Sequence, residues 1–274
     1  GFYTHDPALF PPLPLEWKSP SQITNAIVCL SPLLDERVFL ELEALGCESL
    51  EIRSKNPVSK EDLLDILQHT KSSSIANIDL ILPYTDRLKK ELEEISNKHI
   101  RINQIILYSS PLERQYELKH CAVILTPQLI TNESCGIIST SYFTSNVTLY
   151  TESLQFNSCL NRKIAIDETG EIRNCPSMQK AYGNIQTSSL LSAIQQPDFQ
   201  TYWHINKDQV KVCQDCEFRY ICTDCRAYTE DPEDDYSKPL KCGYDPYTGE
   251  WQEWSQHPVK QAAIQHYFGQ TQLT

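Results

Sequence analysis

The chain has 274 residues, of which 40% are hydrophobic and 22% are charged, a composition typical of ordinary globular proteins. A formal net charge of -12 offers no basic surface for a phosphate backbone, so we expect no nucleic-acid partner. The apolar runs are too short to span a bilayer, and no secretory leader pattern is present. We therefore expect a cytoplasmic protein without a membrane partner.

The first half of the chain alternates strand-like runs with amphipathic helices. After an extended segment, residues 1–21, which we expect to be the remnant of an upstream region, strand-like runs start near positions 25, 50, 78 and 104. These starts are 25, 28 and 26 residues apart, about the length of one βα unit. Residues 22–150 are therefore predicted to form a parallel sheet with right-handed crossovers, either open or closed into a partial barrel.

Capping residues indicate where the first two helices begin and end. We expect Ser31 to cap a helix with Pro32 in its first turn, and Gly46 to end that helix. A second helix is expected to start at Ser59. The sequence contains no glycine-rich phosphate loop, so this half lacks the usual mark of nucleotide binding.

The second half differs in character. Residues 151–257 are rich in loops and cysteines, and residues 258–274 have helical spacing. The segment "RKIAIDETGEIRNC" predicts a hairpin that turns at Glu168 to Gly170. Such a hairpin brings Cys159 and Cys175 near one another.

Cysteines are numerous and unevenly placed. The chain has 11, and in a reducing compartment metal binding is more common than disulfide formation. We expect the four in the first half to be buried as small apolar side chains. These four are Cys29, Cys47, Cys121 and Cys135. The other seven lie between residues 159 and 242.

The spacing of the later thiols favours iron over zinc. Two C-x2-C pairs, Cys213/Cys216 and Cys222/Cys225, are separated by only five residues. Zinc ribbons usually place a longer hairpin between their pairs, whereas iron–sulfur cores take thiolates from several loops. Zinc at one or both sites stays an alternative. Cationic residues surround these thiols in sequence, and they either offset the charge of a cluster or merely solvate the surface. They are Lys207, Lys211, Arg219, Arg226 and Lys241.

At this point the sequence resembles a known family. A C-x10-G-x4-C pattern followed by C-x2-C-x5-C and two more cysteines is similar to the SPASM domain of radical SAM peptide-modifying enzymes. The resemblance implies two 4Fe-4S clusters. The first would be held by Cys213, Cys216, Cys222 and Cys242. The second would be held by Cys159, Cys175 and Cys225, with a fourth ligand that varies within the family or is absent.

Two details complicate the second cluster. The gap before Cys225 contains two residues, Thr223 and Asp224, where the family has three, so Cys225 is placed differently. His204, the histidine nearest the thiols in sequence, is a candidate fourth ligand, although we favour an ordinary surface imidazole.

The βα repeats resemble a degenerate radical SAM barrel. The family's C-x3-C-x2-C motif is missing after the first strand, where Cys29 stands alone, and "SKNPVS" at 54–59 replaces its G-G-E-P segment. This departure implies no S-adenosylmethionine (SAM) and no radical chemistry. The expected fold class is α/β: a degenerate partial (βα)n radical-SAM-like barrel followed by a small irregular α+β Cys-rich SPASM domain.

A narrower group shares segments spread over nearly the whole chain. "FPPLPLEWKSPSQITNAI", "CGIIS", "YGNI" and "KCGYDPYTGEWQEW" resemble the SPASM-domain peptide maturases of grasp-with-spasm systems. The resemblance implies a role in maturing a ribosomally synthesised peptide, by binding the precursor peptide, an ATP-grasp ligase, or both. We expect a non-catalytic maturation partner. Two alternatives stay open: an enzyme that uses an open iron of the second cluster on a peptide, and a zinc-stabilised structural module.

Overall fold

A computed structural model describes residues 15–269, and most of the predicted N-terminal extension and the last five residues of the predicted C-terminal helix lie outside that range. The main sheet has eight strands in the order β5-β6-β4-β3-β2-β1-β7-β8. Its strands are β1 (Asn25–Cys29), β2 (Ser49–Arg53), β3 (Asn77–Pro83), β4 (Ile102–Tyr108), β5 (Arg114–Glu117), β6 (Ala122–Leu125), β7 (Lys163–Ile166) and β8 (Ile172–Arg173). The α-helices are α1 (Glu36–Ala44), α2 (Lys60–Gln68), α3 (Asp86–Lys98), α4 (Val147–Ser153), α5 (Leu190–Ile194) and α6 (Gln261–Phe268).

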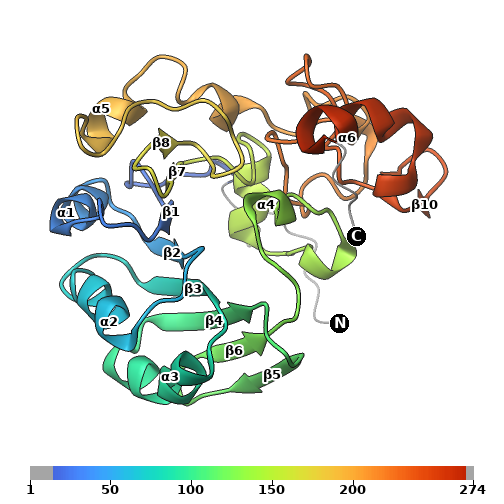
Figure 1. Cartoon of the computed structure of the whole chain (residues 1–274). Helices are drawn as coiled ribbons and strands as arrows, with labels where there is room; N and C mark the ends of the chain where they lie inside the picture. Colours follow the sequence, from blue (N-terminus) through green and yellow to red (C-terminus); the bar gives the residue numbers. More distant parts are fainter. Residues whose placement is uncertain (1–14, 270–274) are drawn as a thin grey trace, which may run out of the picture.

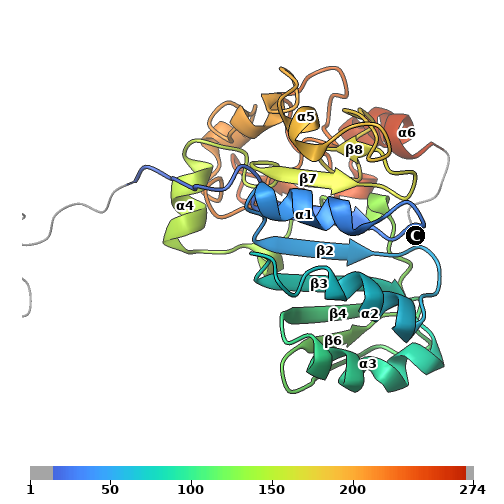
Figure 2. The same cartoon turned by 90° about the vertical axis from the view of Figure 1, so that its left-hand side faces the viewer.

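The sheet is mostly parallel, as the βα repeats predicted. Strands β7, β1, β2, β3, β4 and β6 run in one direction, and the edge strands β5 and β8 are antiparallel to their neighbours. Figure 2 shows these parallel strands with α1, α2 and α3 in front of them. Because β7 pairs with β1, the sheet continues across residue 150. Strand β5 was not predicted, and its polar sequence RQYE explains why the periodicity missed it.

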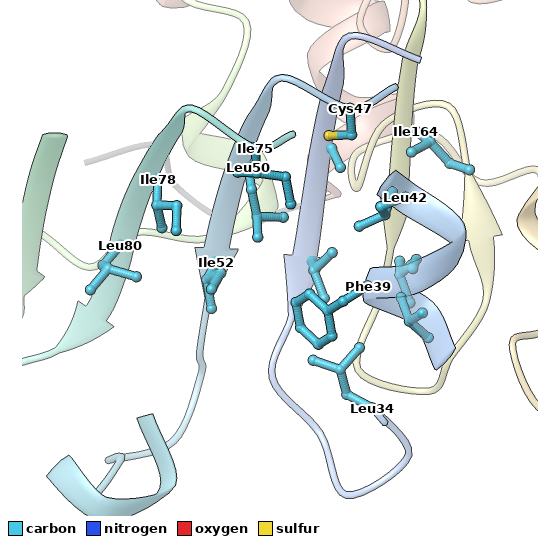
Figure 3. Close-up of a cluster of buried hydrophobic side chains, with 14 of the residues drawn as sticks. Leu34, Phe39, Leu42, Cys47, Leu50, Ile52, Ile75, Ile78, Leu80 and Ile164 are labelled. Carbon is cyan, nitrogen blue, oxygen red and sulfur yellow. The ribbon is translucent and has the colours of Figure 1, made fainter. Parts of the chain in front are cut away.

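Helices α1, α2 and α3 cover one side of the curved sheet, and α5 lies beside α1. Helices α4 and α6 lie on the other side (Figure 1). Alternating strand residues such as Leu50 and Ile52 are buried against α1, α2 and α3. Figure 3 shows Phe39 and Leu42 of α1 pointing toward the strands, beside Ile164 of β7. All five side chains have at most 2% of their surface exposed, so burial of apolar area stabilises this layer.

The helix boundaries agree with the sequence in part. Ser59 caps α2 by accepting a hydrogen bond from the Asp62 amide, as predicted. Helix α1, however, begins at Glu36 with Asp35 as its N-cap, so the predicted cap at Ser31 is wrong. The Leu34 amide donates to the Ser31 carbonyl at 3.1 Å and closes a separate turn before the helix. Gly46 ends α1 at φ +80°, a conformation that glycine adopts without strain.

The predicted hairpin is formed by β7 and β8, which pair antiparallel around a turn at Gly170. As far as residue 269, the chain beyond it has few regular elements: four 3-10 turns, α5, α6 and a two-stranded sheet of β9 (Tyr244–Asp245) and β10 (Glu250–Trp251). Between residues 15 and 269 no helix combines the length and apolar character needed to cross a membrane.

Candidate metal centre

Four cysteines line one small apolar cavity in the C-terminal half. They are Cys213, Cys216, Cys222 and Cys242, the set that the family resemblance assigns to the first cluster. The Cys216 amide donates to the Cys213 carbonyl at 3.0 Å, and the two cysteines joined by this tight turn line the same cavity. Ile138, Phe143, Phe218 and Tyr244 pack around three of the thiols, Cys216, Cys222 and Cys242. The cavity volume is about 20 Å³, so the thiols must turn outward to admit a core of several irons.

A buried lysine contacts one of the thiols of this first site. Lys207 is 5% exposed, and its Nζ donates to Cys222 Sγ at 2.9 Å. Burial disfavours its ammonium, but Cys222 and Asp224 outweigh burial and raise the pKa of Lys207. A fixed positive charge beside the sulfur lowers the cost of holding a thiolate or an anionic cluster there.

A second cavity of about 430 Å³ contains four more thiols. Three of them, Cys159, Cys175 and Cys225, are the set that the resemblance assigns to the second cluster. The fourth is Cys135, which we expected to be an ordinary buried apolar residue. That expectation is wrong, because Cys135 is only half-buried and lines this cavity, whereas Cys29, Cys47 and Cys121 are buried as predicted.

Two hydrogen bonds and the β7–β8 hairpin bring together the segments that carry the three expected thiols of the second cavity. Ser158 Oγ donates to the Cys222 carbonyl and accepts from the Asp224 amide, both at 3.1 Å. These bonds join the segment that carries Cys159 to the segment that carries Cys225. The β7–β8 hairpin then brings Cys175 to the same cavity, as its turn predicted.

The second site also has a lysine. Lys163 at the start of β7 is half-buried, and its Nζ donates to Cys159 Sγ at 3.3 Å. Burial opposes its charge, but Cys159, Cys175 and Cys135 together raise the pKa of Lys163. Each cavity therefore pairs one ammonium with one of its sulfurs. Sequence analysis did not identify Lys163, because it lies in the first strand of the hairpin, far along the chain from the two C-x2-C pairs.

Burial favours the protonated form of Cys175, Cys213, Cys222 and Cys225. It raises the pKa of Cys213 and of Cys225 to about 12 and that of Cys175 to about 11. Neighbouring thiols raise the values for Cys175 and Cys225 further. Metal binding would therefore displace protons, since only the thiolate is a good ligand.

The two cavities are adjacent, because Ile138 lines both of them. The chain between Cys222 and Cys225 passes from one cavity to the other and carries Asp224. The Asp224 carboxylate and the Arg226 guanidinium are fully buried and 2.7 Å apart, and Asn157 Nδ2 donates to the same carboxylate at 2.7 Å. This buried ion pair holds the connecting segment in place.

Of the other residues that the sequence places near the thiols, some line the cavities or contact a ligand loop and others do not. Arg219 lines the first cavity and Arg226 the second, and Lys241 is buried beside Cys135. Lys211 instead forms an exposed ion pair with Asp234. His204 is exposed and packs on Phe156, and it lines neither thiol cavity.

Within residues 15–269, no three His, Cys, Asp or Glu side chains converge as closely as a single bound metal ion requires. The thiols surround cavities instead. Comparisons with protein-family models, with curated proteins and with solved structures found no match. The chemistry of the two sites therefore has to be inferred from the sequence and from this geometry.

The sequence around Cys135 does differ from that around the three cysteines buried in the core. Cys29, Cys47 and Cys121 pack within the core, and two of them stand in apolar strand sequences, "NAIVCL" and "CAVIL". Cys135 lies in "TNESCGIIST", between polar turn residues and a glycine. A cysteine in a polar loop is not needed for core packing, and that difference separates it from the other three.

Proposed function

We propose that this chain is an iron–sulfur SPASM protein that carries two 4Fe-4S clusters and assists the maturation of a ribosomally synthesised peptide. In this proposal it binds the precursor peptide, an ATP-grasp ligase, or both. It uses neither SAM nor radical chemistry, and its sheet is a degenerate form of the radical-SAM-type partial barrel.

One observation carries the proposal. The resemblance divides seven cysteines into a group of four and a group of three, and each group lines a cavity of its own. The grouping is interleaved, because Cys222 and Cys225 are close in sequence but line different cavities. An ordinary apolar core would give no reason for thiols to be sorted in this way.

The donor set fits an anionic cluster. Each cavity offers four thiols and has a lysine that donates to one of its sulfurs. When bound, a 4Fe-4S cluster would supply one-electron redox chemistry or structural cross-linking of the loops. A zinc ion, with Zn–S bonds of about 2.3 Å, needs its sulfurs within roughly 4 Å of one another. Thiols spread around a cavity as large as the second are better suited to a core of several atoms.

The sheet supports the barrel part of the proposal. It is curved, and its three longest helices lie on one side, as in a βα barrel. Cys29 is 5% exposed at the end of β1, and burial followed by the Glu168 carboxylate raises its pKa to about 11. A single buried thiol of this kind cannot supply the three thiolates that a SAM-binding cluster requires.

The metal content tests the cofactor part. Protein purified without oxygen should be brown and contain about eight irons, with matching sulfide, per chain. Cys213→Ser combined with Cys216→Ser should remove about four of those irons, whereas Cys47→Ala, which alters a thiol outside both cavities, should remove none. Stoichiometric zinc without sulfide would overturn the cluster assignment in favour of a zinc module.

Partner binding tests the maturation part. Calorimetry of the anaerobic protein against the precursor peptide, and separately against the ATP-grasp ligase, should show saturable binding to at least one. The double variant Cys213→Ser/Cys216→Ser provides a matched sample that lacks the first cluster. An iron-loaded protein with no affinity for either partner would contradict the proposed role while leaving the metal assignment intact.

A further inference from the structure

We infer that Cys135 is the fourth protein ligand of the second cluster, which is therefore coordinatively complete. This inference rests on the proposed function, because it takes the occupant of the cavity to be a 4Fe-4S cluster. Its basis is the second cavity, where Cys135 joins Cys159, Cys175 and Cys225. Three of these thiols come from the cysteine-rich half of the chain, and Cys135 comes from the segment after β6.

The turn that carries Cys135 is bonded to the segment that follows Cys175. Asn132 Nδ2 donates to the Pro176 carbonyl at 3.1 Å, and Ser177 Oγ donates to the Asn132 carbonyl at 2.9 Å. Two bonds in opposite directions between the same segments fix their relative position. The Cys135 thiol is thus placed on the same cavity as the thiol of Cys175 by contacts that involve neither sulfur.

A buried lysine also holds the Cys135 peptide in place. Lys241 is 2% exposed, and its Nζ donates to the Cys135 carbonyl at 3.0 Å and to the Glu133 carbonyl. The same ammonium lies 4.7 Å from the ring centre of Tyr228 and 5.0 Å from that of Phe268. These cation–π contacts offset part of the cost of burying the charge. Lys241 is therefore a positioning residue for Cys135.

The residue after Cys135 brings the backbone against a second thiol. Gly136 has φ +83°, and a Cβ atom at this position would lie 2.8 Å from Cys225 Sγ. Only glycine permits both the conformation and the approach. The Cys135–Gly136 backbone is thus in contact with the Cys225 side of the cavity, as a ligand loop would be.

Cationic side chains of the sheet also act on this group of thiols. The Arg53 guanidinium at the end of β2 pairs with Glu51 and is also attracted by Cys135 and Cys175, while Lys163 is attracted by Cys159, Cys175 and Cys135. Both cations are therefore attracted by Cys135 together with expected ligands of the second cluster. With four cysteine ligands every iron has a protein ligand, which leaves no vacant position for a substrate. The second cluster is then suited to electron transfer or to holding loops together, and not to Lewis-acid catalysis on a peptide.

Thiol accessibility and iron content test this inference together. In anaerobic wild-type protein, iodoacetamide should leave Cys135 unmodified along with the seven expected ligands, and removal of iron should expose it. Cys135→Ala should reduce the iron content from about eight to about four per chain, or convert the second cluster to a three-iron form with a changed electron paramagnetic resonance spectrum. Cys121→Ala, outside both cavities, is the matched control and should change neither.

The outcomes separate this inference from the proposed function. Wild-type protein with about eight irons in which Cys135 reacts freely would overturn the inference alone. A Cys135→Ala protein that keeps all its iron and an unchanged spectrum would also overturn the inference alone. Wild-type protein that binds no iron overturns both. Because the alkylation measurement uses the unmutated chain, a variant that fails to fold does not weaken the test.

Discussion

The two halves of this chain are stabilised in different ways. The sheet and its helices bury a large, continuous set of aliphatic side chains, and their backbone groups are paired in regular strands and helices. Apart from α6, residues 205–269 of the cysteine-rich half form only two-residue strands and short turns, and their three apolar clusters are small and each contain cysteine. Apolar burial is therefore enough to stabilise the first half, whereas the second half depends on polar contacts and, in our proposal, on metal.

Buried charged side chains also distinguish the two halves of the chain. Within the described part of the chain, the buried lysines and arginines, Lys207, Arg226, Lys241 and Lys260, all belong to the cysteine-rich half. Burying a charge is costly unless it is paired and hydrogen-bonded. The cysteine-rich half nevertheless contains four buried cations. Buried cations are expected where a protein binds an anionic group such as the proposed cluster.

The largest expected effect comes from removing the metal. Stripping iron from the anaerobic protein with a chelator should unfold much of the cysteine-rich half, because structural metal sites contribute on the order of 10 kcal/mol to folding. Hydrogen exchange should show lost protection over residues 205–245 and retained protection in β1 to β4. Equal loss of protection in both halves would break the comparison.

The buried ion pair should have the next largest effect. Arg226→Met leaves the Asp224 carboxylate buried without its partner, which typically costs about 3–5 kcal/mol. The cost should appear in hydrogen exchange of the cysteine-rich half and in iron retention. Arg87→Met, which breaks exposed ion pairs with Glu61 and Glu91, should cost little, because solvent screens such pairs. If the two variants lost similar amounts of stability, burial would not be what makes the Asp224–Arg226 pair important.

A core truncation probes the first half. Leu80 is fully buried in β3, so Leu80→Ala should lower the free energy of unfolding by about 2–5 kcal/mol. Urea denaturation measures this loss, and iron content should stay unchanged because Leu80 lines neither cavity. The matched control is Leu40→Ala on the exposed side of α1, which should change stability by less than about 0.5 kcal/mol. Loss of iron in Leu80→Ala would show that the halves are more tightly coupled than proposed.

The smallest effect concerns pH. Burial, followed by Lys71 and Lys98, lowers the pKa of His99 at the end of α3. The folded state therefore favours the neutral imidazole, and the unfolded state binds more protons in mild acid. This contribution to stability is complete above the unfolded value of about 6.5 and is lost as the pH falls through the lower folded pKa. His99→Gln should flatten the decline of the urea midpoint over that range, and an unchanged decline would exclude His99 as its source.

Local pattern was sufficient for much of the fold. The spacing of strand starts predicted the parallel strands, and Ser59 and Gly46 marked real helix ends. The cap at Ser31 failed because a separate turn uses that serine's carbonyl before the helix begins. Strand β5 was missed because an edge strand with a polar sequence lacks the alternation that buried strands show.

For the candidate site, the sequence alone specified which residue types were available, and its resemblance to a family pattern predicted how seven cysteines would be grouped. Folding then placed Cys135 on the cavity of three of those thiols and Lys163 beside one of them, Cys159. The physical reason is that periodicity and capping act over a few residues. The position of Cys135 depends instead on hydrogen bonds to Pro176, Ser177 and Lys241, which are distant in sequence and become neighbours only when the chain has folded.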